Sequence, residues 1–380
     1  MEKEVIRLRN EMADVYLTYE KTNDFDYCYG GTRSVLSSAS DSEAEETLNY
    51  LGCYESGVKN TLINHAIQNG VFNNFRDRLP EGFLGSRVGG GRCVIRPKTP
   101  EIDIILSNPN HKDFDEVVNC IFAQIGKKLN ELGGRLKLTP DFGRFAGLAD
   151  ILHKYTEHVL GIRCENGGCG GKASYTSTGI NSAVSFFANS RNKNTSVVLI
   201  GSNGACGCGV LDYLKKEKSN ISGICDLTYF NNFTDEDRLR VFEAVSGKFT
   251  EECLSSGNLI VATTVGKEFM NSNFNIIKPN STVLLAHNNC LPIDDSSIRI
   301  IEDMKNKGIV IVPGQLLTLG GALTSRIEWF WRQSKGSVFF DKQLAHDSVW
   351  HIVNYLMEQF YDSIKNKEDP FKLIATTQCA

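Results

Sequence analysis

The chain has 380 residues, which is enough for two domains of ordinary size. Its composition, with 41% hydrophobic and 23% charged residues, is typical of a globular protein, and its formal charge of −4 gives no reason to expect nucleic acid or an anionic membrane as a partner. The charged start of the sequence lacks the apolar core of a signal peptide, and no segment has the apolar length of a membrane helix, so we expect a cytoplasmic protein.

The twelve cysteines are expected to be reduced thiols, most of them in the core, because the chain shows no secretion signal. Four of them, Cys164, Cys169, Cys206 and Cys208, have a spacing that is poor for zinc. We therefore expect no metal site.

Residues 1–155 mix short apolar segments with helical patterns. The segments 93–97 (CVIRP) and 102–106 (IDIIL) are predicted to be strands, and residues 113–132 have apolar positions at helical spacing. Three glycines, Gly89 to Gly91, stand directly before Arg92. Such a triplet forms either a turn or the floor of a ligand site, because glycine lets another group approach the backbone closely.

From about residue 174 onward, predicted helices alternate with buried strands. Residues 178–190 and 208–218 have helical patterns, whereas 196–201, 221–227, 258–264, 281–287 and 308–314 are apolar runs of strand length. This alternation is typical of a parallel, doubly wound sheet. Residues 165–174 contain four glycines and indicate a connector, and residues 347–366 are predicted to form a helix that packs on the first domain.

A glycine turn follows the first of these strands. Gly201, Gly204 and Gly207 stand where a dinucleotide fold needs a tight turn, close approach to a pyrophosphate and the N-terminus of a helix. Asp226 ends the next strand, where a carboxylate can bind the adenosine ribose hydroxyls. Neither Arg nor Lys follows it to hold a 2′-phosphate, so NAD is favoured over NADP. The alternative is a structural turn before a helix.

These patterns predict an α/β protein with two domains, an N-terminal α/β domain and a Rossmann-like, doubly wound NAD-binding domain. We assign residues 1–155 and 346–380 to the first domain and residues 156–345 to the dinucleotide-binding domain.

Eight motifs occur in an order that resembles the glutamate/leucine/phenylalanine/valine dehydrogenase family, and the leucine and phenylalanine branch most. They are GGTR at 30–33, VKN at 58–60, GGGR at 89–92, TPDFG at 139–143, TSTG at 176–179, the nucleotide turn, AHNNCL at 286–291 and GIVIVPGQLLTLGGALTSRIEW at 308–329. The resemblance covers nearly the whole chain and implies oxidative deamination of an amino acid, with NAD as cofactor, and a homo-oligomer. It also implies that the first domain (residues 1–155 and 346–380) is the α/β substrate and oligomerisation domain and that a cleft lies between it and the NAD-binding domain.

The resemblance also implies roles for particular residues. Lys59 matches the lysine that pairs with the substrate carboxylate, Asp141 matches the carboxylate that carries a proton to and from the amine, and the backbone at Gly30 and Gly31 matches the part that approaches the amino acid. Taken alone, Lys59 fits a surface charge and Asp141 a turn former. Around the nicotinamide and the nucleotide turn, the matching positions are Thr176, Gly201, Ser202, Asn203, Gly204, Ala205, Cys206, Gly207, Asp226, Leu227, Ala262, Thr263, Asn288 and Asn289.

The main departure from the family pattern is Arg92, which stands where the family has its catalytic lysine. A lysine in a cleft can lose its proton and help water to attack, whereas a guanidinium stays charged and can only anchor an anion or polarise a carbonyl or imine. Gly314, Thr318 and His287 also replace family residues. About twenty extra residues separate Lys59 from Arg92 and form a lid, a subunit contact or a tolerated surface loop.

The sequence favours an NAD-dependent oxidoreductase that acts on an apolar or aromatic L-amino acid, since no basic residue is clearly placed for a second carboxylate. Two alternatives remain open. One is a diverged biosynthetic enzyme that oxidises or reduces an unusual amine or imine. The other is a nucleotide-binding protein without turnover, because a fold does not establish an activity.

Overall fold

The computed structural model describes residues 3–140, 142, 147–191, 195–226, 241–243, 251–264, 275–287, 295–335 and 338–366. The chain forms two compact units. Unit 1 comprises Met1–Lys172, Ala322–Ala345 and Lys367–Ala380, and unit 2 comprises Ala173–Gly321 and His346–Asn366. No helix within the described ranges is both long and apolar enough to cross a membrane.

Unit 1 is built on a mixed sheet in the order β1-β2-β4-β3-β5. Its strands are β1 (Lys3–Arg9), β2 (Ala13–Glu20), β3 (Tyr27–Ser34), β4 (Val88–Pro97) and β5 (Leu136–Pro140). Strand β2 runs antiparallel to both β1 and β4, whereas β3 is parallel to both β4 and β5. The parallel part needs crossover connections, and the helices between these strands supply them.

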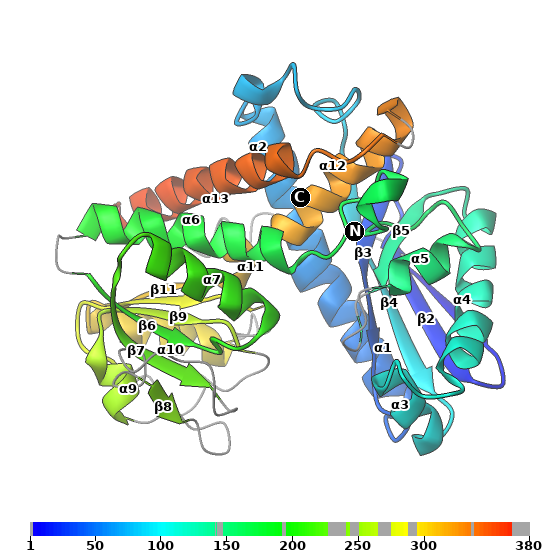
Figure 1. Ribbon diagram of the computed structural model, residues 1–380, viewed down its shortest axis with the longest axis horizontal. Helices are drawn as coiled ribbons and strands as arrows, with labels where there is room; N and C mark the ends of the chain where they lie inside the picture. The colour runs from blue at the N-terminus through cyan, green and yellow to red at the C-terminus, as the bar shows by residue number, and fades with distance from the viewer. Residues whose placement is uncertain are drawn as a thin grey trace. The chain divides into compact units, whose positions relative to one another are not determined.

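The two faces of this sheet differ in polarity because side chains alternate along each strand. One face carries Val15, Leu17, Cys93 and other apolar residues. It packs with α3 (Pro100–Ser107), α4 (Phe114–Glu131) and α5 (Leu148–His153), which lie together on one side of the sheet in Figure 1. The other face, called the polar face below, carries Thr18 and Arg92 beside two small apolar clusters that contain Val94 and Val88. It lies against α1 (Asp41–Tyr50), the π-helical turn η1 (Leu51–Gly57), α2 (Val58–Gln68) and the part of α12 (Gly320–Lys335) that belongs to unit 1.

The segment IDIIL is helical, so its assignment to a strand was wrong. It lies in α3, where Thr99 caps the N-terminus by accepting from the Ile102 N–H and Pro100 occupies the first turn. The apolar residues Ile102, Ile105 and Leu106 face the core at helical spacing. The short run lacked the alternation that separates a strand from a buried helix.

The twenty-residue insertion between Lys59 and Arg92 packs onto unit 1. It extends α2 and includes the short 3-10 turn η2 (Asn73–Phe75). The fully buried Arg326 on α12 donates from Nε to Ser86 Oγ (3.0 Å), from Nη1 to Asn64 Oδ1 (2.7 Å) and from Nη2 to the Ser86 carbonyl. Phe72 and Phe83 are buried beside it. This anchoring gives much of the insertion a structural role in unit 1.

Unit 2 contains an all-parallel sheet in the order β11-β10-β9-β6-β7-β8. Its strands are β6 (Ser196–Ile200), β7 (Asn220–Asp226), β8 (Val241–Glu243), β9 (Leu259–Ala262), β10 (Thr282–Leu285) and β11 (Val310–Val312). Renumbered from β6, this is the strand order 3-2-1-4-5-6 of the dinucleotide-binding fold, and its switch point lies between β6 and β9. The helices assigned to this unit are α6 (Ala173–Arg191), α7 (Ala205–Lys216), α9 (Glu251–Ser256), α10 (Asp295–Asn306), α11 (Gly314–Leu317) and most of α13 (Lys342–Lys365).

The α/β class with a doubly wound second domain is confirmed, but the units have other bounds than we expected. The chain passes from unit 1 to unit 2 after Lys172, within the glycine-rich stretch that also holds the turn η3 (Cys164–Asn166), and α12 returns to unit 1. Residues 346–366 belong to unit 2, not to the first domain. The reason lies on α6. A Cβ on Gly179 would lie 2.6 Å from the Leu317 carbonyl oxygen and 3.2 Å from Val353 of α13, and the Ser182 hydroxyl donates to the Trp350 carbonyl.

Candidate active site

Arg92 and Gly31 lie side by side on the polar face of the first sheet. The register pairs Thr18 with Arg92 and Gly31 with Thr139, and the pairs Tyr29–Gly90 and Thr32–Cys93 bring Gly31 next to Arg92. A Cβ on Gly31 would lie 2.9 Å from Arg92 Nη1. The guanidinium therefore occupies the space above this glycine.

Glu55 brings Lys59 and Arg92 together. Its Oε2 lies 3.2 Å from Arg92 Nη1, and its Oε1 lies 3.7 Å from Lys59 Nζ, one helical turn further along the chain. Lys59 is 6% exposed and Arg92 is 3% exposed. Burial raises the pKa of Glu55, but the charges of Arg92, Lys59 and Arg33 outweigh it, so that its pKa is lowered and the carboxylate is charged at neutral pH.

Glu55 was missed by the sequence analysis, although its spacing from Lys59 was visible. A Glu four residues before a Lys favours an ion pair on a helix. Glu55 belongs to η1, and π-helical turns are frequent at functional sites. No linear pattern connects this turn to Arg92, because the contact depends on how η1 packs over β4.

The glycine triplet allows that packing. A Cβ on Gly90 would lie 2.6 Å from the Cα of Gly57 at the end of η1. On Gly89 a Cβ would overlap Phe25, and on Gly91 it would overlap Leu136. The triplet therefore brings η1 and the start of α2 close to β4 and is a packing surface, neither a turn nor a bare floor.

Several polar atoms around Arg92 are buried without a hydrogen-bond partner among the described residues. They are Arg92 Nε, Thr18 Oγ1 and Asn60 Oδ1. Asn60 Nδ2 is engaged, since it donates to the carbonyls of Tyr29 (3.1 Å) and Gly89 (2.9 Å). Because unsatisfied polar atoms are costly in a protein interior, these atoms suit a polar ligand or ordered water.

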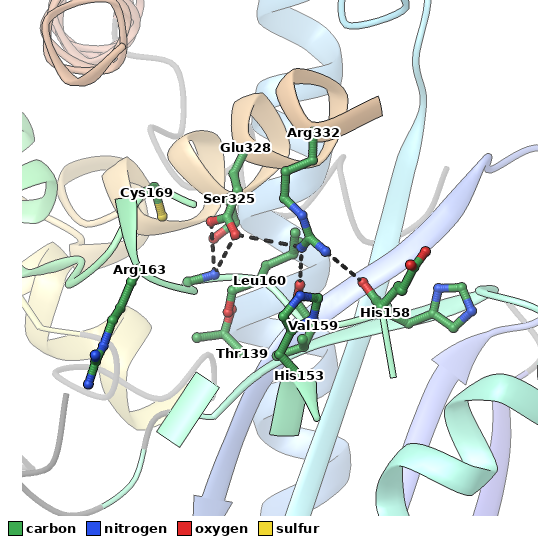
Figure 2. Close-up of polar contacts among 12 residues, drawn as sticks. Thr139, His153, His158, Val159, Leu160, Arg163, Cys169, Ser325, Glu328 and Arg332 are labelled. Carbon is green, nitrogen blue, oxygen red and sulfur yellow. Dashed lines mark hydrogen bonds and ion pairs between the residues drawn. The ribbon is translucent and has the colours of Figure 1, made fainter. Parts of the chain in front are cut away.

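The loop before the connector is held to α12 by two charged side chains, as Figure 2 shows. The buried carboxylate of Glu328 accepts the Gly161 N–H with both oxygens (3.0 and 2.8 Å). Arg332 Nη1 lies 3.9 Å from the same carboxylate and donates to the Val159 carbonyl (2.7 Å). These contacts fix residues 159–161 beside the end of β5.

Asp141, the third expected catalytic residue, lies outside the described residues, as do Leu227, Asn288 and Asn289. Of the expected substrate residues in unit 1, Lys59, Arg92 and Gly31 are therefore brought together, and Gly30 adjoins them on β3. A Cβ on Gly30 would overlap the Gly91 carbonyl oxygen, so this glycine serves strand packing.

In unit 2, the expected nucleotide turn joins β6 to α7. Gly201 has φ of +79°, a left-handed conformation that favours glycine, and Gly207 packs so closely on the Gly201 carbonyl that a Cβ would overlap it. Gly204 is the N-cap of α7 and provides no side-chain cap. Ser202 Oγ is buried without a partner among the described residues. A helix N-terminus of this kind can bind phosphate through its backbone N–H groups.

The other expected cofactor residues that the structure describes surround this turn. Asp226 accepts the Asn203 N–H at 2.8 Å, which places its carboxylate at the turn. Thr263, after Ala262 at the end of β9, donates to the carbonyls of Ile200 and Gly201 (2.9 Å each). Thr176 lies on α6 beside Ser177, whose hydroxyl donates to the Cys206 carbonyl (2.9 Å).

Three departures from the family pattern lie together in unit 2. A Cβ on Gly314 would overlap the His287 carbonyl oxygen, and the Thr318 hydroxyl donates to the Gly314 carbonyl at 2.7 Å. Burial lowers the pKa of His287 to about 4, so the imidazole is neutral near pH 7. Gly314 thus contacts both Thr318 and His287.

Known structures share this architecture across the whole chain. L-tryptophan dehydrogenase from Nostoc punctiforme is 16% identical, with a TM-score of 0.66, over 99% of this chain and 94% of that one. This chain has the fold of the amino acid dehydrogenases. Glutamate dehydrogenase from Peptoniphilus asaccharolyticus is 13% identical, with a TM-score of 0.63, over 99% of this chain and 88% of that one. The leucine-bound hetero-hexameric glutamate dehydrogenase from Thermus thermophilus is also 13% identical, with a TM-score of 0.66, over 99% of this chain and 87% of that one. No protein-family model and no curated protein matches the sequence.

Within the amino acid dehydrogenase fold, the described residues supply two sets of functional groups. Unit 1 supplies buried cations on a polar sheet face, and unit 2 supplies a glycine turn with a carboxylate beside it. The first set suits a small anionic group, and the second suits a nucleotide.

Proposed function

We propose that this protein is an NAD-dependent dehydrogenase that oxidatively deaminates an apolar or aromatic L-amino acid. The observation that carries the proposal is the charge balance around Glu55, where two buried cations, Lys59 and Arg92, share one carboxylate. The surplus positive charge suits the carboxylate of an amino acid. The shared fold with amino acid dehydrogenases supports the reaction class.

In this proposal, Arg92 and Lys59 bind the substrate carboxylate. A guanidinium presents a planar set of donors that fits a carboxylate, and the compact ammonium of Lys59 adds a second charge. Glu55 holds both cations in position. Asp141 is proposed, from the family resemblance, to carry a proton to and from the substrate amine.

The residues of the turn fit a dinucleotide. The uncapped N-terminus of α7 can bind the pyrophosphate, Ser202 has an unpartnered hydroxyl among the described residues, and Asp226 provides a carboxylate for the ribose hydroxyls. The carboxylate favours NAD because it would repel a 2′-phosphate. When bound, the nicotinamide supplies a hydride acceptor for the substrate Cα. A homo-oligomer is part of this proposal.

Arg92 favours a second candidate, an enzyme that interconverts an amine and an imine without hydrolysis. A guanidinium cannot serve as the base that activates water, and its position over Gly31 suits polarisation of a carbonyl or an imine. This candidate shares the fold and both binding sites with the first.

A turnover panel tests the proposal. The purified protein is given each L-amino acid with NAD, or each 2-oxo acid with ammonia and NADH, and reduced nicotinamide is followed by absorbance. We expect turnover with an apolar or aromatic amino acid and a large increase in KM for Lys59→Met, with Lys128→Met as the surface control. Nucleotide binding without turnover by any amino or oxo acid would contradict the first candidate, and turnover of an imine alone would support the second.

A further inference from the structure

The hydroxyl of Tyr29 is the centre of a buried polar cluster in unit 1. Lys172 Nζ donates to Tyr29 Oη at 2.7 Å, Ser325 Oγ lies 2.8 Å from Oη, and Thr139 Oγ1 lies 3.0 Å from it. Lys172 also donates to Thr139. Tyr29 is 7% exposed and Ser325 is fully buried, whereas Lys172 is partly exposed. Lys172 therefore covers the buried phenol, and its ammonium group points into the cluster.

This cluster lies on the same sheet face as Arg92. Tyr29 and Gly31 are two residues apart on β3 and so project from one face, and Tyr29 pairs with Gly90, two residues before Arg92 on β4. Both residues between Tyr29 and Arg92 on this face are glycines, so no side chain from the sheet separates them. Asn60 holds the backbone of Tyr29 by donating to its carbonyl.

The loop in Figure 2 positions Lys172. Gly161 has φ of +90°, and a Cβ there would lie 3.3 Å from Lys172 Cε, so the lysine chain runs over this glycine. Glu328 in turn binds the Gly161 N–H. Burial lowers the pKa of Lys172, but Tyr29, Cys169 and Glu328 outweigh it and raise the pKa, so the amine is an ammonium at neutral pH.

We propose that Tyr29 and Lys172 form a second acid–base pair, beside Asp141, that exchanges a proton with the substrate amino group in a protein whose Arg92 cannot do so. The inference rests on the proposed function. Lys172 donates to the phenolic oxygen and stabilises negative charge on it. Glu328 is a positioning residue, since it acts through Gly161.

The proton transfer balances in atoms and electrons. In the reductive direction, the Tyr29 phenol gives its proton to the substrate nitrogen: the O–H bond breaks, an N–H bond forms with the nitrogen lone pair, and the electron pair of the O–H bond stays on oxygen. The Lys172 ammonium keeps its own proton and stabilises the negative charge on that oxygen. A proton from water then returns to the oxygen, and oxidation follows the same steps in reverse.

Charged and titratable groups surround Tyr29 on the elements packed against it. They are Lys172 and Cys169 of the connector, Tyr27 on β3, Lys137 on β5, Arg92 on β4, and Arg326, Glu328 and Arg332 on α12. Lys172 is the cation that contacts the Tyr29 oxygen directly. Loss of this one charge is therefore the sharpest perturbation of the phenol.

The test compares Tyr29→Phe, Lys172→Met and Lys172→Arg with the wild type. One control is Tyr16→Phe. Tyr16 lies on β2 of the same sheet, and its hydroxyl donates to Asp41. The other control is Lys128→Met at the surface. We expect Tyr29→Phe to lower kcat by about 100-fold or more. Lys172→Met is expected to move the pH profile of oxidation to higher pH, and Lys172→Arg to restore it in part. NAD affinity should stay unchanged in all variants.

A second readout does not depend on turnover. Calorimetric titration of the amino acid into cofactor-free protein, in two buffers of different ionisation enthalpy, counts the protons exchanged on binding. This count should differ between the wild type and Tyr29→Phe, because the bound amino group then lacks its hydroxyl partner. If Tyr29→Phe fails to fold, the pH profiles of Lys172→Met and Lys172→Arg test the inference in its place.

Wild-type kcat and pH profile in Tyr29→Phe, or a loss no larger than in Tyr16→Phe, would overturn the inference and leave the proposed function standing. A Lys172→Met variant with an unmoved pH profile would overturn it as well. A wild type that neither binds nor oxidises any amino acid would overturn both the proposed function and the acid–base pair.

Discussion

The guanidinium of Arg92 lies against the backbone of Gly31, where a Cβ would be 2.9 Å from Nη1. The contact is made by the far end of a flexible side chain, and Glu55 holds the same Nη1 at 3.2 Å. The nearest atoms that a Cβ on Gly31 would meet all belong to the Arg92 side chain and none to the backbone. A substitution at Gly31 can therefore move the guanidinium without disturbing the strand pairing.

Gly31→Ala should therefore fold but lose activity. The added methyl displaces the guanidinium, and a displacement of about 1 Å in a positioning group can cost about 100-fold in rate. Thermal unfolding and kcat/KM measure the two effects separately. The contrast is Gly30→Ala, whose methyl would overlap the Gly91 carbonyl and should prevent folding. An active Gly31→Ala enzyme would show that the position of Arg92 is not critical.

Glu55→Gln should destabilise the protein by about 3 kcal/mol at neutral pH, because it leaves Arg92 and Lys59 buried without their carboxylate. The folded-state pKa of Glu55 is lowered, so its contribution is present above the ordinary value and is lost as the pH falls through the folded pKa. The difference between variant and wild type in denaturant unfolding should thus shrink below about pH 4.

The control for this measurement is Glu131→Gln, which breaks an exposed pair with Lys128 and should change the stability by less than about 1 kcal/mol. A Glu55→Gln variant as stable as Glu131→Gln would mean that water solvates Lys59 and Arg92 and that these cations do not depend on Glu55 as a buried partner.

Arg92→Lys should increase ordinary oxidative deamination or shift its pH profile, since a lysine in this buried position can lose its proton and a guanidinium cannot. The measurement is kcat/KM over a series of pH values. Unchanged rates and an unchanged profile would show that this position is not the catalytic one of the family.

Asp226→Asn should weaken NAD binding about tenfold, because a charged acceptor for the ribose hydroxyls is lost. Its affinity for NADP should rise relative to that for NAD. Fluorescence titration with both nucleotides measures this, with Asp212→Asn on the exposed side of α7 as the control. Equal NAD affinity in the two variants would remove Asp226 from the cofactor site.

The regular parts of the fold could be predicted from the sequence. The strands β6, β7, β9, β10 and β11 lie where apolar runs predicted them, because a buried parallel strand needs such a run. The turn at Gly201 and its neighbour Asp226 are also brought together as expected. In contrast, IDIIL became a helix through its cap at Thr99, a local signal that the apolar pattern obscured.

The contacts of the candidate site could be predicted only in part. The resemblance selected Lys59 and Arg92, which share Glu55, but Glu55 and Lys172 were missed. Both are positioned by packing between segments far apart in the chain: η1 over Gly90, and the connector over Gly161. The bounds of the units depended on the same kind of contact, between α13 and Gly179 of α6.

The most direct test of the central claim is the fate of the hydrogen on the substrate Cα. The protein is incubated with NAD and an apolar L-amino acid that carries deuterium at Cα, and the reduced cofactor is analysed by mass spectrometry. We predict that one deuterium appears on the nicotinamide and that ammonia and the 2-oxo acid form with it. Reduced cofactor without deuterium, or no reduction with any amino acid, would contradict the proposed function.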